Sequence, residues 1–559
     1  MKIKKQEKVD LNKLILLCSF TAQIIMFAYE LVNNTMYCDE VMTILNARSI
    51  ADRGTDITGE AMPFYFDTWV YGGQSPFATY VMALFIRLFG YSLFVSRLPM
   101  LIISLLSLYV FYLFAKEIFD GRQEYVAPAL LFCGISPWHI FSGAYTLDCN
   151  FFPHFFLIGC LFLVKAIKSA KPTGLYMLAM LFFGIAFYCY IASAYIIPFM
   201  LTAVYIYLLI KRKITFKNAA ISVAALTVVS LPFILFGLVT QGIIEPFTLC
   251  GINFNEMPYF DKVEHYSSAA DFLKSAAKEL WYGITLLILP DTFITKGTVS
   301  VFTYTYGLGG FFAGVGIIYL LIKLKRDKNY LSQGSRAILL GGLVTGILFC
   351  IVARASLASA HYRFGALNYL AFIPLGVGFA EIFRLLKNDK VRTALKASAV
   401  SLSVIILSVV YIFSYQAMQA ESYTAYGREF LNAAEFAQEQ SEGNFAVCNV
   451  RSKNANDTNM RIAVYLNYCY YGEKELAPLD EDIIIRGGLA EKYKIKEYMG
   501  KTNIQLTRDN SVRYIDASRE SITDDCFIAY RRDLEEKIKI APKDYKEKRF
   551  GPWVVMYKN

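Results

Sequence analysis

The sequence predicts a polytopic α-helical membrane protein with about 11–13 membrane-spanning helices and a small C-terminal extracytoplasmic α/β domain. Two observations lead to this fold class. Hydrophobic residues make up 56% of the chain, against about 45–50% in soluble domains, and they occur in runs long enough to cross a bilayer. After residue 420 the composition changes, because charged residues become frequent and the apolar runs become short.

Hydropathy and length place about eleven spans in the first part of the chain. The first span follows Met1-Lys-Ile-Lys-Lys, which resembles the start of a signal peptide. Its apolar run is too long for one, and no small-residue cleavage site follows, so we expect an uncleaved span. The predicted spans lie at residues 12–32, 95–115, 125–141, 149–167, 175–190, 192–210, 217–239, 302–323, 336–354, 364–386 and 396–418.

Basic residues predict the orientation of these spans. Every second connection is basic, and basic connections remain in the cytoplasm. We therefore expect a multi-pass protein of the cell membrane with a cytoplasmic N-terminus and an extracytoplasmic tail. The net charge of +10 follows from these connections, and without a nucleic-acid motif we expect no nucleic-acid partner. The basic connections lie at residues 2–8, 116–122, 165–171, 211–213, 323–328 and 384–392.

Two long loops of the membrane domain face the outside in this topology, at residues 33–94 and 240–301. In the first loop, residues 41–51 have helical periodicity. Residues 76–89 are apolar but too short to span comfortably, which indicates a helix lying in the membrane interface. Residues 269–289 form an amphipathic stretch of the same kind. Both interfacial stretches could instead be ordinary spans, although this would disturb the alternation of basic connections.

The domain boundary is expected at residue 420, with a membrane domain at 1–420 and an α/β domain at 421–559. The tail alternates short β-like and helix-like runs, which is typical of a small α/β domain. No C-x-x-C pair occurs, so neither a zinc ribbon nor a redox motif is predicted, while a disulfide between Cys448 and Cys526 stays open. The β-like runs are 445–450, 526–530 and 553–557, and the helix-like runs are 428–439 and 460–470.

Asp39 and Glu40 directly follow the first span, at the outer rim of the membrane. An ionised carboxylate in hydrocarbon is costly, so acids at such a position are usually either solvated or functional. A functional carboxylate here could act as a general base or as a metal ligand. It could equally cap the helix that begins near Val41. The spacing alone does not decide between these interpretations.

Asp148 is a second acid at the outer rim, in the very short connection between the third and fourth spans. It either caps the fourth span or faces the same external cavity as Asp39. Taken alone, capping is the simpler interpretation, but two acids on one membrane face favour a shared site. His139 and His154 lie near the same side, where most histidines are structural, and no spacing in the chain resembles a zinc site.

Arg354, His361 and Arg363 lie at the outer ends of the ninth and tenth spans, against the bias for basic residues on the inside. The guanidinium fork suits phosphate, so we predict that this group binds one, although the side chains could also reach toward lipid phosphates. Arg97, at the outer start of the second span, is a candidate of the same kind. Residues 480–482 resemble a metal-binding D-x-D motif, which we interpret as a solvated turn.

Several ordered motifs resemble one family of membrane enzymes. The acid pair after the first span is followed by Gly72-Gly73-Gln74-Ser75-Pro76-Phe77, a short interfacial helix, Leu88-Phe89-Gly90-Tyr91-Ser92, and then Ser96-Arg97-Leu98-Pro99. Ser136-Pro137-Trp138-His139 and the late Arg363, Asn368 and Ile373-Pro374 fit the same order. Over about residues 10–420 the chain resembles the GT-C class of glycosyltransferases. It is most similar to bacterial relatives of the protein O-mannosyltransferases and of the lipid A aminoarabinose transferase.

This resemblance implies an inverting transfer of a sugar, a hexose or a pentose, from a polyprenyl phosphate at the outer face of the membrane. The acceptor would be a glycan, a lipid or a protein. The resemblance implies that Asp39 activates the acceptor hydroxyl or contacts the donor, that Asp148 supports the same cavity, and that Arg363 binds the leaving phosphate. It also places Glu40, Gln74 and Tyr145 at the substrate cavity.

The chain departs from its relatives at two places. Gln74-Ser75-Pro76 stands where the aminoarabinose transferases have an acidic and a basic residue before Pro-Pro, so neither their metal site nor their sugar is implied. The loop 240–301 is too short for the β-trefoil domain of the eukaryotic mannosyltransferases. We expect no certain cofactor, and a divalent cation stays open.

Two other functions remain alternatives. One is a polymerase or ligase of envelope polysaccharide, and the other is a transporter or flippase for a lipid-linked sugar. A transporter should place paired polar groups near the bilayer midplane, often at broken helices. The candidate groups here lie at the outer rim, which favours chemistry at the membrane surface.

Overall fold

The computed structural model divides into two compact units. The first comprises Met1–Ala28, Leu98–Ile234 and Val263–Tyr415, and the second comprises Tyr29–Arg97, Leu235–Lys262 and Gln416–Asn559. The residues that the structure describes are 10–33, 36–56, 59–67, 73–255, 268–288, 294–295, 298–299, 309–327, 329–352, 365–421, 425–426, 428–449, 503–505, 511–517, 521–531, 534, 544–551 and 553–558.

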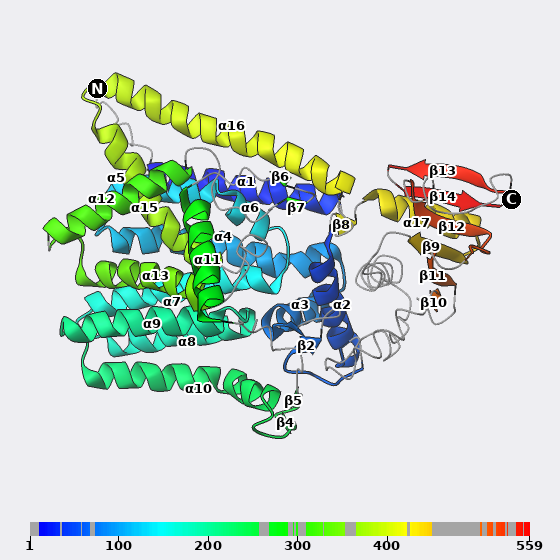
Figure 1. The fold of residues 1–559 in the computed structure, drawn as a ribbon, viewed down its shortest axis with the longest axis horizontal. Coiled ribbons are helices and arrows are strands. Elements are labelled where there is room, and N and C mark those ends of the chain that lie inside the picture. The colour runs from blue at the N-terminus through cyan, green and yellow to red at the C-terminus, as the bar shows by residue number, and fades with distance from the viewer. Residues whose placement is uncertain are drawn as a thin grey trace, which may run out of the picture. The chain divides into compact units, whose positions relative to one another are not determined.

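The first unit is a bundle of long apolar helices, many of which run side by side, and α11 crosses them steeply in the view of Figure 1. Among the described residues, seven helices are long and apolar enough to cross a membrane, which confirms the predicted multi-pass helical fold. Its helices are α1 (Leu11–Asn33), α4 (Leu93–Ile118), α5 (Gln123–Gly134), α6 (Pro137–Ser142), α7 (Asp148–Lys168), α8 (Thr173–Cys189), α9 (Ser193–Ile210), α10 (Phe216–Thr240), α11 (Ala269–Ile288), α12 (Gly309–Arg326), α13 (Gln333–Val352), α15 (Gly365–Arg384) and α16 (Asp389–Glu421), of which α1, α4, α10 and α16 extend into the second unit.

One predicted span is not a single helix. Residues 125–141 form two helices, because α5 ends at Gly134 and α6 begins at Pro137. A residue before proline avoids the helical conformation, and proline has no N–H to continue a helix, so Ser136-Pro137 separates the two. The short α6 and the connection after it carry several of the predicted site residues.

Glycines allow α12 and α15 to approach closely. A Cβ on Gly316 would overlap the carbonyl oxygen of Pro374, and a Cβ on Gly378 would overlap that of Phe312. Without a hydrophobic driving force between helices in lipid, small residues at a crossing permit the close van der Waals contact that holds membrane helices together. The two glycines therefore set the separation of α12 and α15.

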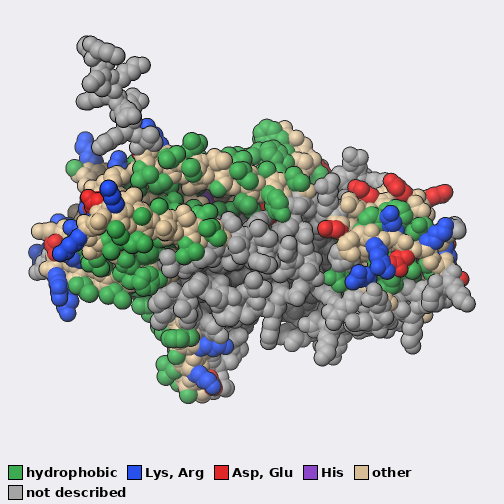
Figure 2. All heavy atoms as spheres, turned by 90° about the horizontal axis from the view of Figure 1, so that it is seen from above, with side chains coloured by type: hydrophobic (Ala, Val, Ile, Leu, Met, Phe, Trp, Pro, Cys, Tyr) green, Lys and Arg blue, Asp and Glu red, His purple; other side chains and the backbone are tan. Residues whose placement is uncertain are grey.

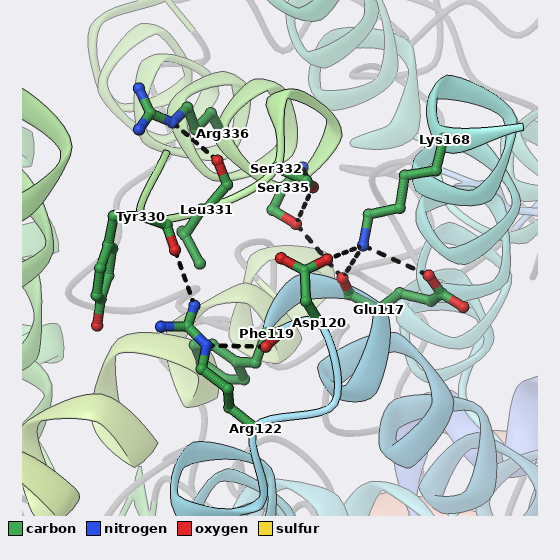
Figure 3. Close-up of polar contacts among 10 residues, drawn as sticks. All are labelled: Glu117, Phe119, Asp120, Arg122, Lys168, Tyr330, Leu331, Ser332, Ser335 and Arg336. Carbon is green, nitrogen blue, oxygen red and sulfur yellow. Dashed lines mark hydrogen bonds and ion pairs between the residues drawn. The ribbon is translucent and has the colours of Figure 1, made fainter. Parts of the chain in front are cut away.

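At one end of the bundle, the end of α4 with the turn after it, the end of α7, and the start of α13 with the connection before it meet in a polar network (Figure 3). Lys168 donates to Asp120 at 2.7 Å and pairs with Glu117 at 3.5 Å. The Ser335 hydroxyl donates to the Glu117 carbonyl at 3.4 Å. Three segments that are distant in sequence are thus joined at this end.

Arg122 belongs to the same network. Its guanidinium donates to the carbonyl oxygens of Phe119 and Tyr330, each at 3.0 Å, and lies over the rings of Tyr125 and Tyr330. Arg336 likewise donates to the Leu331 carbonyl at 3.1 Å. Residues in or next to three of the predicted basic connections, 116–122, 165–171 and 323–328, therefore lie together at one end of the bundle.

Figure 2 shows the surface of the helical unit, where a broad hydrophobic belt gives way to Lys and Arg side chains at one end. Large apolar side chains are exposed on the outer helices, including Leu17 and Ile25 of α1 and Phe216 and Val228 of α10. Exposed apolar patches of this extent indicate contact with a partner or a membrane. The surface thus agrees with the multi-pass assignment.

The second unit contains the helices of the first predicted external loop. The expected helix at 41–51 is α2 (Cys38–Arg53), and α3 (Pro76–Phe89) has the predicted bounds. They pack against each other through α2 residues such as Met42 and α3 residues such as Met82. The short strands here are β1 (Met36–Tyr37), which pairs with β8 (Ala425–Tyr426), β2 (Phe66–Asp67), which pairs with β3 (Gly73–Gln74), and β4 (Phe247–Leu249), which pairs with β5 (Ile252–Phe254).

The tail forms a mixed sheet covered on one face by α17 (Arg428–Gln440). The strand order is β10-β11-β9-β12-β14-β13, with β9 parallel to both of its neighbours and the other pairs antiparallel. The predicted strand-like and helix-like runs of the tail are confirmed, except 460–470, which lies outside the described residues. The strands are β9 (Phe445–Asn449), β10 (Asn503–Gln505), β11 (Val512–Asp516), β12 (Cys526–Tyr530), β13 (Lys546–Phe550) and β14 (Trp553–Tyr557).

The two cysteines of this sheet do not form a disulfide. Cys448 and Cys526 are both free and buried. Cys526 belongs to the cluster beneath α17, and Cys448 belongs to the cluster on the other face. Successive side chains of a strand point to opposite faces, so the two thiols are separated by the sheet, and the disulfide left open by the sequence is absent.

Candidate active site

The first candidate acid, Asp39, is the second residue of α2. A carboxylate in the first turn of a helix is stabilised by the partial positive charge of the unpaired N–H groups. The side chain of Asp39 lies outside what the structure describes, so its role stays a prediction. Its neighbour Glu40 is described and is completely buried.

Glu40 forms a buried ion pair with Arg97 of α4. The Nε of Arg97 donates to Oε1 of Glu40 at 2.8 Å, and its Nη2 donates to Oε2 at 2.6 Å. Both side chains have no solvent exposure. A two-pronged guanidinium–carboxylate pair fixes both distance and orientation, so it joins the first turn of α2 to the first turn of α4.

Two predicted site residues are thus brought together, 57 positions apart in the sequence. A buried charge whose partner is removed is strongly destabilising, so this pair holds the backbone that carries Asp39. The predicted phosphate-binding role of Arg97 stays a prediction, and its bond with Glu40 favours a positioning role. Spacing alone gives no signal for such a long-range pair.

Gln74 lies at the end of β3 and is buried. The next residue, Ser75, shares a hydrogen bond of 3.2 Å with the Tyr65 hydroxyl. The ring of Tyr65 stacks on Phe236 at 4.9 Å. The loop that carries Gln74 is therefore held by buried polar and aromatic contacts before α3 begins at Pro76.

Asp148 is the first residue of α7, at the end of the short connection from α6. Its Oδ1 accepts a hydrogen bond of 2.7 Å from the backbone N–H of Cys149, as expected for an acid at a helix N-terminus. The amide of Asn150 donates to the carbonyl oxygens of Tyr145 at 2.9 Å and Ser142 at 3.2 Å. Tyr145 itself is buried. The connection that presents Asp148 is thus closed by side-chain bonds.

His139 and His154 lie close together in the same region. Their ring centroids are 6.1 Å apart, and both side chains are completely buried. The Nδ1 of His154 is 2.8 Å from the hydroxyl of Tyr369 on α15. Trp138 meets the Tyr369 ring edge-on, with centroids 5.0 Å apart. Tyr369 was not among the predicted site residues, because no local sequence pattern marks a tyrosine inside an apolar span.

The predicted cations Arg354, His361 and Arg363 lie outside the described residues. The first described residue after them is Gly365, where α15 begins. A Cβ on Gly365 would lie 3.2 Å from Pro153 of α7 and 3.7 Å from Nε1 of Trp138. The start of α15 therefore packs beside α6 and the first part of α7.

The structure describes the predicted site in two groups. Glu40, Arg97 and Gln74 belong to the second unit, and Asp148 and Tyr145 belong to the first. Within the part of the chain that the structure describes, no three His, Cys, Asp or Glu side chains are grouped as metal ligands. Residues 480–482 lie outside that part, and the divalent cation stays open.

A family model matches part of the chain. Residues 73–238 match the family described as dolichyl-phosphate-mannose-protein mannosyltransferase. This segment contains α3, α4 and α7, and therefore Gln74, Arg97, Tyr145 and Asp148. No curated protein sequence matches the chain.

Two solved proteins share the fold. ArnT from Cupriavidus metallidurans is similar in its apo state, with a TM-score of 0.51 and 13% identity over 97% of both chains. The same protein bound to undecaprenyl phosphate gives a TM-score of 0.52, again with 13% identity over 97% of both chains. The apo oligosaccharyltransferase of Archaeoglobus fulgidus gives a TM-score of 0.50 with 12% identity, over 83% of this chain and 64% of that one. The chain therefore shares the fold of these proteins, in agreement with the resemblance drawn from the sequence.

Proposed function

We propose that this protein is a glycosyltransferase that moves a hexose or pentose from a polyprenyl phosphate to an acceptor hydroxyl at the outer face of the membrane, with inversion. The observation that carries the proposal is the buried Glu40–Arg97 pair. It fixes the first turn of α2, and with it the backbone of Asp39. A buried ion pair costs desolvation, and here it stabilises the position of an adjacent acid. The matched family segment and the shared fold support the same function.

The proposed reaction is a displacement at the anomeric carbon. Asp39 accepts the proton of the acceptor hydroxyl, or contacts the donor beside the reacting carbon, as a positioned carboxylate can. The acceptor oxygen forms a bond to the anomeric carbon on the side opposite the phosphate. The bond from that carbon to the phosphate oxygen breaks, and the electron pair leaves with the polyprenyl phosphate. Attack from the opposite side inverts the anomeric centre.

The leaving group carries negative charge that must be compensated. We assign this task to Arg363, with His361 and Arg354 as further candidates, because a guanidinium pairs with two phosphate oxygens at once. Arg363 precedes Gly365 by two residues, and Gly365 lies beside Pro153 and Trp138. Preorganised positive charge at a leaving group lowers the barrier to its departure.

The remaining candidates would act around these groups. Asp148, at the start of α7, supports the cavity with a second negative charge, and Tyr145 and Gln74 line it. Glu40 and Arg97 hold the first turn of α2 without touching the substrate. In this proposal they are positioning residues and Asp39 is the catalytic one.

The decisive experiment compares two acids of the same helix. Cells that lack the gene are complemented with wild type, Asp39→Asn or Asp52→Asn, and their envelope lipids and glycans are measured by mass spectrometry. Asp52 lies on α2 with 59% of its side chain exposed, so its amide variant is a matched control. We expect wild type and Asp52→Asn to restore a sugar modification that Asp39→Asn does not. Unchanged glycans in all strains, the gene-deleted strain included, would contradict the function.

A second measurement distinguishes transfer from transport. The purified protein in nanodiscs is given a polyprenyl-phosphate sugar and an acceptor, and free polyprenyl phosphate is measured. A transferase releases polyprenyl phosphate in proportion to glycosylated acceptor, whereas a flippase moves the intact lipid-linked sugar and releases none. If the lipid-linked sugar crosses the bilayer without cleavage, the transporter alternative is correct.

A further inference from the structure

A buried polar cluster lies where α6, α7 and α15 meet. We call Trp138, His139, His154 and Tyr369 the imidazole cluster. None of these side chains is more than 2% exposed. Phe111 stacks on the ring of Tyr369 at 5.7 Å, so the cluster is embedded in aromatic side chains. Polar groups inside a membrane protein are costly and usually functional, and the proposed chemistry does not use these.

The cluster has fewer internal hydrogen bonds than its polar atoms require. The Nδ1 of His154 is bonded to the Tyr369 hydroxyl at 2.8 Å. The Nε2 of His154 and both ring nitrogens of His139 find no hydrogen-bond partner in the part of the chain that the structure describes. Each buried polar atom left unsatisfied costs about 1–3 kcal/mol. Three such atoms within one cluster therefore indicate a polar ligand between the rings.

The spacing of the rings indicates how large this ligand is. Their centroids are 6.1 Å apart, whereas a direct hydrogen bond between two imidazoles, with nitrogens about 2.9 Å apart, would bring the centroids to about 5 Å. One oxygen at about 2.8 Å from a nitrogen of each ring separates the centroids by roughly 6 Å when the angle at the oxygen is near tetrahedral. A single water molecule fits this separation, and buried waters typically bridge polar groups in this way.

We propose that an ordered water bridges His139 and His154 and completes a hydrogen-bonded chain from α6 through α7 to Tyr369 of α15, and that this chain positions Asp148. The second part rests on the proposed function. His139 lies on α6, His154 lies on α7, and Asp148 begins α7 at the end of the connection between them. The hydrogen-bonded chain thus links the two helices on either side of the connection. Through Tyr369 it also links them to α15, the helix that follows the predicted phosphate-binding cations.

The bonds of Asn150 strengthen this interpretation. Its amide closes the connection onto the Ser142 and Tyr145 carbonyl oxygens. These two bonds hold the connection and the end of α6 to the first turn of α7. Because a displacement of about 1 Å at a reacting group can cost about 100-fold in rate, a chain that fixes this turn to α15 would be visible in kcat.

The test uses two substitutions at one position. In His154→Asn the side-chain amide lies near the place of Nδ1 and can still bond the Tyr369 hydroxyl, whereas His154→Leu cannot. We expect kcat of His154→Leu and of Tyr369→Phe to fall by about 10- to 100-fold with little change in KM. His154→Asn keeps the Tyr369 bond but has no atom at the place of Nε2 to bond the water, so its kcat should fall by clearly less than that of His154→Leu. Equal losses in His154→Asn and His154→Leu would overturn the positioning role, as would a wild-type kcat in Tyr369→Phe.

A structural measurement tests the water without any activity. A high-resolution cryo-EM map of the wild-type protein in a nanodisc should show density within hydrogen-bond distance of both imidazoles, and the map of His139→Phe should lack it. A wild-type map with the rings resolved and no density between them would refute the chain. If the wild type shows the density and transfers no sugar, then the proposed function fails while the water site stands. Thermal unfolding of each variant identifies any that does not fold, and Tyr369→Phe, which keeps the ring, then carries the kinetic test.

Discussion

Removing either partner of the Glu40–Arg97 pair should destabilise the protein far more than removing both. The single variants Glu40→Leu and Arg97→Met each leave one buried charge without its partner. Both side chains have no exposure, so neither solvent nor salt screens the remaining charge effectively. In the double variant the same space is filled by two apolar side chains, and no uncompensated charge remains.

The size of the effect follows from the burial and the geometry. Breaking a buried pair by removing one partner costs about 3–5 kcal/mol, whereas replacing the whole pair with apolar residues is often neutral or stabilising. The bonds of 2.8 and 2.6 Å that join the two groups are both lost in each single variant. We therefore expect the unit that holds the pair to unfold on the order of 10 °C below wild type in each single variant, at about 2–4 °C per kcal/mol for a unit of about 150–250 residues. In the double variant it should unfold near the wild-type temperature.

Thermal unfolding of the purified protein in nanodiscs measures this cycle. The unfolding temperatures of wild type, the two single variants and the double variant under one condition are sufficient, because their comparison gives the coupling free energy between the two residues. Additive losses, with the double variant the least stable of the four, would refute the reasoning. Sugar transfer measured on the same samples adds a second readout, because the double variant should be stable and yet slow if the pair also positions Asp39.

Three further predictions concern other parts of the fold. Gly316→Ala should destabilise the helical unit by about 1–3 kcal/mol or more, as overpacking does, since its new Cβ would meet a backbone carbonyl of α15. Thermal unfolding checks it. A maleimide should label Cys250, which is exposed, but not Cys526 at pH 8, because burial raises the pKa of that thiol to about 12 and only the thiolate reacts. Peptide mapping by mass spectrometry reads the labelling. Arg122→Ala should cost about 1–3 kcal/mol, because it leaves backbone carbonyls without their donor, measured again by thermal unfolding.

Each of these predictions has a matched control in the chain. Gly237→Ala places its Cβ in open space on α10, so it should be neutral or slightly stabilising. Asp120→Asn removes a pair whose acid is 49% exposed, which should cost less than about 1 kcal/mol. If Gly316→Ala and Gly237→Ala lost equal stability, the close contact between α12 and α15 would not be the cause. If Arg122→Ala and Asp120→Asn lost equal stability, the Arg122 bonds would have no special importance. Labelling of Cys526 in the folded protein at the rate of Cys250 would contradict the burial of its strand.

The elements with strong periodicity could be predicted from the sequence. The bounds of α3 match the predicted apolar stretch, and β12 and β14 coincide with the predicted strand-like runs. The strand β13, Lys546–Phe550, was not predicted, because its side chains are charged and exposed. Charged residues are unfavourable in strands by propensity, yet they suit an edge strand, where they discourage pairing with another chain. Its residues form a strand because they pair with β14 beside them.

The contacts that define the candidate site could not be predicted from the sequence, for a different reason. Glu40 and Arg97 were each selected as site residues, but their pairing joins positions 57 apart, and His154 meets Tyr369 across 215 positions. Local patterns carry no information about such pairs, because any buried acid has several possible cationic partners until the helices are packed. Residue types at the site could therefore be identified from the sequence, whereas a ligand-binding arginine could not be distinguished from one that is paired with a glutamate.

The length of α7 bears on the position of Asp148 relative to the membrane. This helix has 21 residues, which at about 1.5 Å per residue is close to the thickness of the hydrocarbon core. Asp148 is its first residue and Lys168 its last, and Lys168 bonds Asp120 in the polar network of Figure 3. If α7 crosses the membrane, Asp148 and this network lie near opposite surfaces of it. If the basic network is cytoplasmic, as the charge pattern predicts, Asp148 stands at the outer surface, where the proposed donor would be presented. A transporter would instead need its charged groups near the middle of such a helix, and in α7 the charged side chains are confined to the first residue and the last turn.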